Sequence, residues 1–413
     1  MNSSLKPWRR RALLWTAVAV AAWILLRMFE PVLGYSFGWQ TWPAQAEPAV
    51  RWADPAWQDP AAAADAALLK SRRQLDAPAL SAAVMVNGQR VWAGAVGMAD
   101  LEAQTPVDLE TRFRLGSTSK AVNGFALGLL MEHGRIDIDQ PLRTYLPELP
   151  AAYEAVTTRQ AISHRAGVPD YGFCLCFPIW EHRNQRHFTG VREALAVFTQ
   201  RPLLFTPGED FRYSSYGANL AGAAIEVAAH QPYTEFVTRS VFGPLAMSHS
   251  GFDIKAAVDP HRAAFYEVAE GRYKPADPVD NSIRYPSGGM LSTPSDMLLL
   301  GRAWFEGELL SPASRAQLLT VQPLKNGKPN PQGYALGMRV AEGRELLDGQ
   351  VKTRMLSHHG TAVGSTSYFA IFPEYGMVVA VMMNKGQEDL KALAPEAHRL
   401  AEIFLAARLS RKP

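Results

Sequence analysis

A serine and a lysine stand three residues apart in the segment FRLGSTSKAVNG, residues 113–124. Apolar residues such as Val122 and Phe125 then recur at helical spacing, which places Ser117 and Lys120 at the start of a buried helix. The positive end of a helix dipole disfavours a cation there, and a lysine that is also partly removed from water binds its proton less tightly. Because residues three apart share one helix face, Ser117 and Lys120 form a candidate nucleophile and base.

This spacing is not specific by itself. Ser3 and Lys6 have the same separation in the N-terminal tail, where no site can form. A capping serine followed by a solvated lysine is the simpler interpretation of the pattern alone.

Two further segments add polar groups at the ends of expected elements. FRYSSYGANL places Tyr213 two residues before Ser215, just ahead of a helix, and LSHHGTAVG places His358 and Gly360 just ahead of the last expected hairpin. Taken singly, each is an ordinary tyrosine or loop histidine. The order of the three segments is informative, because it matches the order of three motifs in a known protein family.

In that order the motifs resemble those of the serine β-lactamase and penicillin-binding superfamily, in its class C β-lactamase-like branch. The family reads Ser-x-x-Lys, then Tyr-x-Asn or a variant, then Lys-Thr-Gly or His-x-Gly. The resemblance is closest to the mitochondrial-type serine β-lactamase-like proteins and extends over about residues 62–405.

The resemblance implies a role for each matching residue. Ser117 is the acylated nucleophile, and Lys120 and Tyr213 share the proton transfers. The N–H groups of Ser117 and Thr361 form an oxyanion hole, and His358 faces the substrate from a strand edge. The implied oxyanion- and substrate-binding residues are Thr361, Ser215, His358 and Gly360. No metal or organic cofactor is implied.

Strand signals lie near both ends of the chain and helical signals lie between them. Asn87-Gly88 predicts a hairpin turn, and residues 373–376 predict a second turn between two strands. We therefore expect one sheet that is assembled from both ends of the chain, with a helical lobe over about 119–284. The resemblance implies an α/β (α+β) β-lactamase fold, in which an antiparallel sheet is flanked by helices and joined to an all-helical lobe, within one hydrolase domain over 47–413.

Two positions depart from drug-hydrolysing β-lactamases. Ser215 stands where they have an asparagine, and His358 stands where they have a lysine that attracts the carboxylate of the drug. Because a histidine is largely neutral near pH 7, we expect an ester or peptide-like amide substrate and a preference for uncharged esters over β-lactams. A true class C-type β-lactamase and a filament-forming scaffold with residual hydrolase activity are the alternatives.

Residues 1–46 are expected to form a signal or anchor segment. The basic KPWRRR precedes an uncharged apolar run over 12–26, and the small triplet at Ala44–Ala46 lies far downstream of that run. We expect an uncleaved inner-membrane anchor with the catalytic body in the periplasm of the cell envelope. The alternative is a cleaved signal and a soluble periplasmic protein.

Composition argues against nucleic acid as a partner. The formal net charge is +3, and the first 46 residues contain five cations and one acid, so the body carries no excess of positive charge. Cys174 and Cys176 are expected to be two thiols in a loop. A metal site with His182 and His187 is the alternative, although the spacing fits no standard zinc pattern.

Overall fold

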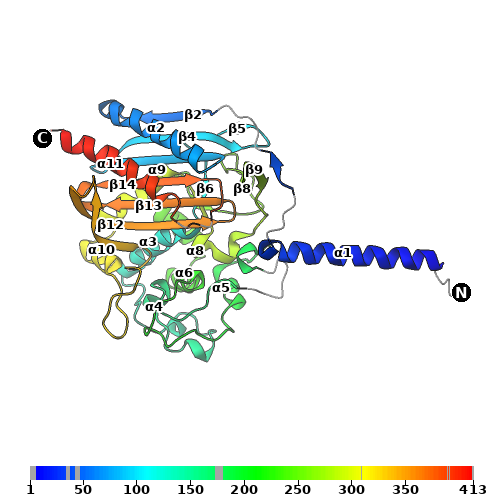
Figure 1. The fold of residues 1–413 in the computed structure, drawn as a ribbon. Coiled ribbons are helices and arrows are strands. Elements are labelled where there is room, and N and C mark those ends of the chain that lie inside the picture. The colour runs from blue at the N-terminus through cyan, green and yellow to red at the C-terminus, as the bar shows by residue number, and fades with distance from the viewer. Residues whose placement is uncertain are drawn as a thin grey trace.

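The computed structural model describes residues 6–33, 38–41, 47–172, 180–307, 309–387, 389 and 391–411. An eight-stranded sheet forms the centre of the body, in the order β11-β12-β13-β14-β3-β4-β2, with β5 paired to β4 (Figure 1). Its strands are β2 (Ala49–Ala53), β3 (Ala79–Val86), β4 (Gln89–Asp100), β5 (Thr105–Pro106), β11 (Arg339–Leu346), β12 (Val351–Ala362), β13 (Ser365–Phe372) and β14 (Met377–Met383). All of their pairings are antiparallel.

Strands from the two ends of the chain meet where β3 pairs with β14, so that Leu80 lies opposite Met383. The turn residues have the expected geometry. Asn87 and Gly88 have φ of 51° and 73°, as a type I′ hairpin requires, and Gly376 has φ of 50° between β13 and β14. The expected sheet and both expected turns are thereby confirmed.

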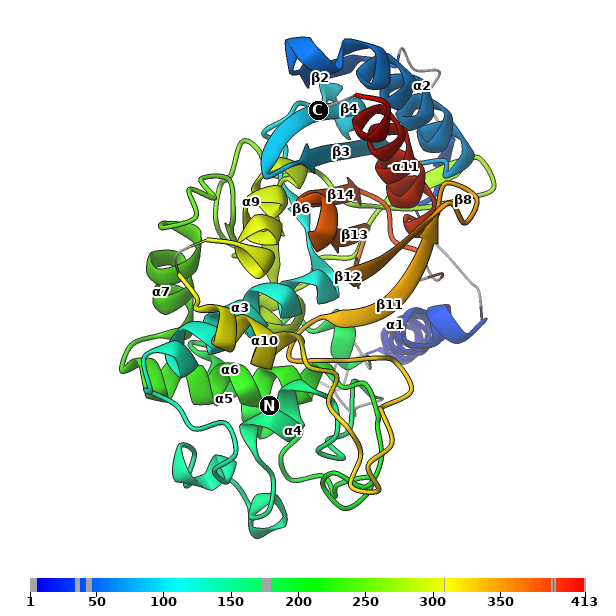
Figure 2. The ribbon, with the colours of Figure 1, turned by 90° about the vertical axis from the view of Figure 1, so that its left-hand side faces the viewer.

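Helices cover both faces of this sheet (Figure 2). Side chains alternate along β14: Val378 and Ala380 join the core that contains α3 (Ser119–Glu132) and α9 (Pro294–Phe305), whereas Val379 and Val381 join the core under α2 (Gln58–Gln74) and α11 (Ala394–Ser410). This alternation follows from the two-residue period of a strand. The sheet is therefore buried on both faces, which explains the continuous apolar sequence of β14.

The remaining helices gather on the α3 side of the sheet, where they build the second lobe. They are α4 (Thr158–Ile162), α5 (Val191–Ala194), α6 (Ser215–Ala229), α7 (Tyr233–Val237), α8 (Tyr285–Gly288) and α10 (Pro312–Leu319). The long α6 packs against α3, α4 and α8. Both α3 and α6 begin at the boundary of this lobe with the sheet, which brings the polar residues at their N-termini together.

Two three-stranded sheets complete the body. One has the order β6-β10-β7 and the other β1-β9-β8. Their strands are β6 (Phe113–Arg114), β10 (Met290–Ser292), β7 (Gly251–Phe252), β1 (Gln40–Thr41), β9 (Arg272–Pro275) and β8 (Tyr266–Ala269). Since β7, β8 and β9 lie within 119–284, that range is not all helical.

The N-terminal helix α1 (Pro7–Leu33) projects from the body (Figure 1). Its stretch Pro7–Phe29 is long and apolar enough to cross a membrane, and none of its 18-residue apolar window is buried. The triplet at 44–46 and the two cysteines at 174 and 176 lie outside the described residues.

Candidate active site

Ser117 lies in the one-turn helix η2 (Gly116–Thr118), directly before α3. Two glycines let this turn touch β12. Gly116 has φ of 51°, and a Cβ there would lie 2.6 Å from the carbonyl carbon of Thr361. A Cβ on Gly360 would lie 2.0 Å from the carbonyl oxygen of Leu115. The absence of both side chains therefore places Ser117 beside the backbone of Thr361.

Lys120 lies under Ser117, with only 1% of its surface exposed. Its Nζ is 3.0 Å from Ser117 Oγ and 3.4 Å from Ser215 Oγ, and it donates to the carbonyl oxygen of Ser287 at 2.8 Å. Burial lowers the pKa of Lys120 to about 8, although nearby Asp170 acts in the opposite direction. A substantial share of this amine is therefore neutral at mildly alkaline pH, and it can accept a proton.

Tyr213 completes the group around Ser117. Lys120 Nζ lies 4.9 Å from the centre of its ring. Burial raises the pKa of Tyr213 well above its usual value, while Arg339 and a hydrogen bond with Ser117 act in the opposite direction. The phenol therefore stays protonated near neutral pH and is suited to donating a proton. The ring is held against His164, with centroids 4.2 Å apart.

Ser215 is the first residue of α6, and Ser214 caps that helix by accepting from the N–H of Gly217 at 3.1 Å. The N–H of Ser215 donates to Asp170 Oδ1 at 3.0 Å, a favourable place for a carboxylate because helix N-termini carry partial positive charge. The Ser215 hydroxyl thus faces the same space as Ser117 and Lys120.

His358 does not face this space, contrary to expectation. Its imidazole is fully buried, and Nδ1 donates to the carbonyl oxygen of His359 at 2.7 Å, so Nε2 accepts from the hydroxyl of Tyr334 at 2.9 Å. Burial, with Arg339 nearby, holds the pKa of His358 well below its usual value. The reason for the orientation is the strand period: Met355, Ser357, His359 and Thr361 share one face of β12, and His358 points to the other.

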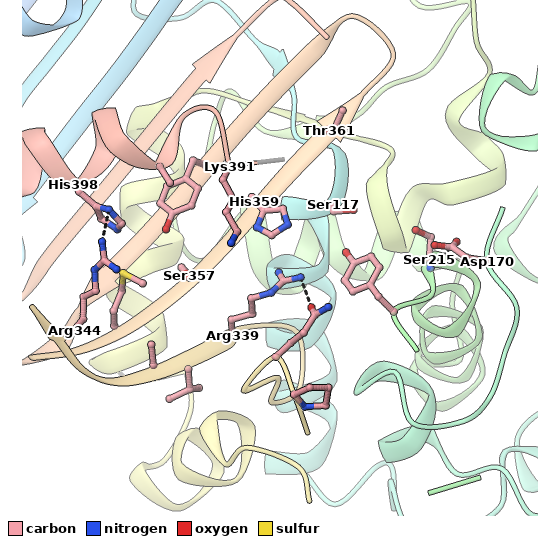
Figure 3. A pocket seen from close by; sticks show the side chains of 18 of the residues that line it. Ser117, Asp170, Ser215, Arg339, Arg344, Ser357, His359, Thr361, Lys391 and His398 are labelled. Carbon is pink, nitrogen blue, oxygen red and sulfur yellow. Dashed lines mark hydrogen bonds between the residues drawn. The ribbon is translucent and has the colours of Figure 1, made fainter. Parts of the chain in front are cut away.

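A cavity of about 820 Å³ opens at Ser117 (Figure 3). Four of the predicted residues line it: Ser117, Tyr213, Ser215 and Thr361. His359 takes the place expected for His358. Lys120 does not line the cavity but contacts Ser117 Oγ, and Gly360, which has no side chain, allows η2 to approach β12.

Three cations on the cavity wall were not predicted from the sequence. These are Arg339, Arg344 and Lys391. None belongs to a motif, and only the pairing of β11 with β12 brings the two arginines to the cavity. Among the described residues, no group of three or more His, Cys, Asp or Glu side chains could hold a metal ion.

Comparisons with known proteins agree with this fold. Residues 50–402 match the sequence profile of the Beta-lactamase family. The chain is 27% identical, over 79% of its length and 77% of the relative, to the mitochondrial serine beta-lactamase-like protein LACTB of Homo sapiens.

Solved structures resemble the chain over most of its length. A D-amino acid amidase from Ochrobactrum anthropi SV3 superposes with a TM-score of 0.71 at 22% identity, covering 85% of this chain and 99% of the amidase. An octameric penicillin-binding protein homologue from Pyrococcus abyssi superposes with a TM-score of 0.68 at 21% identity, covering 84% and 77%. With its profile match spanning nearly the whole body, the chain belongs to the β-lactamase family of serine hydrolases.

Proposed function

We propose that this protein hydrolyses an ester or a peptide-like amide through a covalent acyl-enzyme on Ser117. The observation that carries the proposal is the 3.0 Å contact between Ser117 Oγ and a buried lysine whose pKa is lowered to about 8. A serine is a weak nucleophile unless a base removes its proton, and Lys120 is a base that is already in contact with it.

The reaction begins when Oγ of Ser117 attacks the carbonyl carbon of the substrate and its proton passes to neutral Lys120. The N–H groups of Ser117 and Thr361 stabilise the oxyanion that forms, since η2 and β12 lie in close contact there. Tyr213 then donates a proton to the leaving group as the carbonyl–leaving group bond breaks, and Lys120 returns the proton to Tyr213. Water, with Lys120 again as the base, hydrolyses the acyl-enzyme and releases Ser117.

The division of proton transfers follows from the two pKa shifts. Lys120, with a pKa near 8, can alternate between both protonation states near neutral pH. Tyr213 has its pKa raised, so it acts as a donor and relay rather than as the first base.

We also propose that α1 anchors the protein in the inner membrane and that residues 47–413 work in the periplasm. The apolar stretch within Pro7–Phe29 and the preceding cluster of arginines support this topology.

A fluorophosphonate probe tests the nucleophile. We expect labelling at Ser117, and we expect Ser117→Ala to abolish labelling and to lower turnover of 4-nitrophenyl butyrate by about a thousandfold or more. Lys120→Ala should slow acylation by a similar order, because the base is gone.

Ser3→Ala is the matched control, since Ser3 has the same spacing to a lysine. Labelling that persists in Ser117→Ala would overturn the assignment. Nitrocefin should be included as a substrate, because turnover comparable to that of the esters would favour a true β-lactamase.

A further inference from the structure

The charges around the cavity at Ser117 are unbalanced. Three cationic side chains line it: Arg339, Arg344 and Lys391. Among the described lining residues, Asp170 supplies the single carboxylate. Figure 3 shows Asp170 beside Ser215 at one end of the cavity and Arg344 beside His398 at the other. Arg339 lies between these two ends, with its Cζ 5.5 Å from the centre of the Tyr213 ring, so the cations attract anions along the wall that leads from Tyr213 to Arg344.

No carboxylate of the described residues neutralises these cations, because none lies within 4.0 Å of the three charged groups. Arg354, on the neighbouring strand, does have a carboxylate beside it, since its Nε lies 3.0 Å from Glu342 Oε1. The lack of a nearby carboxylate therefore distinguishes the three cavity cations from Arg354.

Several donors at the cavity are buried without an acceptor. Arg339 Nη2 donates to Gln332 at 2.7 Å, but its Nη1 has no partner. Arg344 Nη2 donates to His398 Nδ1 at 2.9 Å, which leaves Arg344 Nε and His398 Nε2 unpaired. Burying a charged donor without an acceptor is unfavourable, and a guanidinium group fits the geometry of a carboxylate.

A β-bulge directs both arginines to the same side. Arg344 lies five positions after Arg339, so a regular strand would point the two side chains to opposite faces. The register of β11 against β12 shifts between Ala341 and Arg344, where Gly343 has φ of 65°. This extra residue brings Arg344 to the face of Arg339, a usual effect of a bulge.

We propose that Arg339, Arg344 and Lys391 form a carboxylate-binding subsite, and that the substrate carries an acidic group at the end remote from its scissile carbonyl. The inference rests on the proposed function and names the substrate class for that site. Apolar groups, among them Val340, Met355 and Ala394, line the same cavity and suit an aliphatic or aromatic connecting segment.

Matched esters test the subsite. The mono-4-nitrophenyl ester of suberic acid, with a free terminal carboxylate, is compared with the same compound capped as a methyl ester. A second pair, 4-acetoxybenzoate and its methyl ester, places the charge in the leaving group instead. We expect the acidic member of at least one pair to have the higher kcat/KM, by about tenfold or more. The pair that shows this preference identifies whether the acidic group of the substrate belongs to the acyl group or to the leaving group.

Arg344→Gln should reduce that ratio about tenfold or more, mainly through KM of the acidic ester, and high salt should reduce it in the wild type. The ratio within each variant cancels any general loss of active protein. Arg354→Gln is the control and should keep the wild-type ratio, because Arg354 is already paired and does not line the cavity. Ratios at or below one for both pairs, or an unchanged ratio in Arg344→Gln, would overturn the proposal.

Binding of suberate to the Ser117→Ala protein separates the two proposals. Calorimetric titration should show binding of suberate but not of 1,8-octanediol, and Arg344→Gln in that background should abolish it. If every ester resists hydrolysis but suberate binds in this way, the hydrolase proposal fails and the anion subsite stands. If esters are cleaved but suberate does not bind and neither acidic ester is preferred, the subsite proposal fails alone.

Discussion

Lys120 shows how one buried residue can set the pH dependence of the reaction. In the proposed mechanism Lys120 acts as the base, which it can do only without its proton, and its pKa is about 8. We expect kcat/KM for a neutral ester to rise with pH through about 8 and then to level off. His358 contributes no step between pH 6 and 9, because its pKa is held well below the usual value. A profile measured from pH 6 to 10 that is flat, or that rises only near pH 6.5, contradicts this assignment.

The lowered pKa of Lys120 also means that its buried charge destabilises the folded protein at neutral pH. Its pKa is about 8 in the folded protein and 10.5 for an unperturbed lysine, as in the unfolded chain. Between pH 8 and pH 10.5 the unfolded chain therefore binds more protons than the folded protein. The free energy of unfolding should therefore increase with pH over this interval, and the burial of the charge costs about 3 kcal/mol below pH 8.

We thus predict that Lys120→Met is inactive yet melts at a higher temperature than the wild type at pH 7, and that the difference shrinks by pH 10. Thermal unfolding at both pH values measures it. Ser117→Ala, which keeps the lysine, should retain the pH dependence of the wild type. A Lys120→Met protein that is less stable at pH 7 would show that the contacts of the amine outweigh its desolvation.

At the scale of elements, the site depends on the close contact of η2 with β12. Gly360→Ala would place a Cβ 2.0 Å from the carbonyl oxygen of Leu115 and 2.8 Å from the N–H nitrogen of Thr118, both in the backbone. The turn must then move away from the strand and separate Ser117 from Thr361. We expect kcat to fall by about a hundredfold, since small displacements of reacting groups have effects of this size.

Gly190→Ala serves as the comparison for this substitution. Gly190 has φ of −163°, and a Cβ added there would meet open space, with no side chain within 4 Å. We therefore expect kcat and the melting temperature to change little in this variant. Full activity in Gly360→Ala would mean that the contact between η2 and β12 is not required.

At the scale of the whole molecule, α1 projects outward, and the central sheet begins only at Ala49. Removing residues 1–46 also removes β1 from the edge of the β1-β9-β8 sheet and the Arg27–Asp277 ion pair, but it leaves the eight-stranded sheet intact. We predict that the full chain is found in the membrane fraction, and that a chain beginning at Glu47 is soluble and still labelled at Ser117. N-terminal sequencing of the mature protein that begins at Glu47 would instead demonstrate a cleaved signal.

The sequence predicted those features whose signals are local. Ser117 and Lys120 lie on adjoining helical turns, and the Asn87-Gly88 hairpin needs only its own residues, so short-range patterns were enough. His358 was misplaced because its orientation depends on the register of β12, where one residue decides which face a side chain occupies. Arg344 was missed because it reaches the cavity through a bulge.

The pairing of β3 with β14 also has a consequence for biosynthesis. Leu80 leaves the ribosome long before its partner Met383 has been made. Until then the edge of β3 that β14 will cover stays open, and an open edge of an apolar strand is prone to pair with other chains. We therefore expect a chain truncated before β14 to aggregate more readily than the full chain, and its central sheet cannot close before the final hairpin is complete.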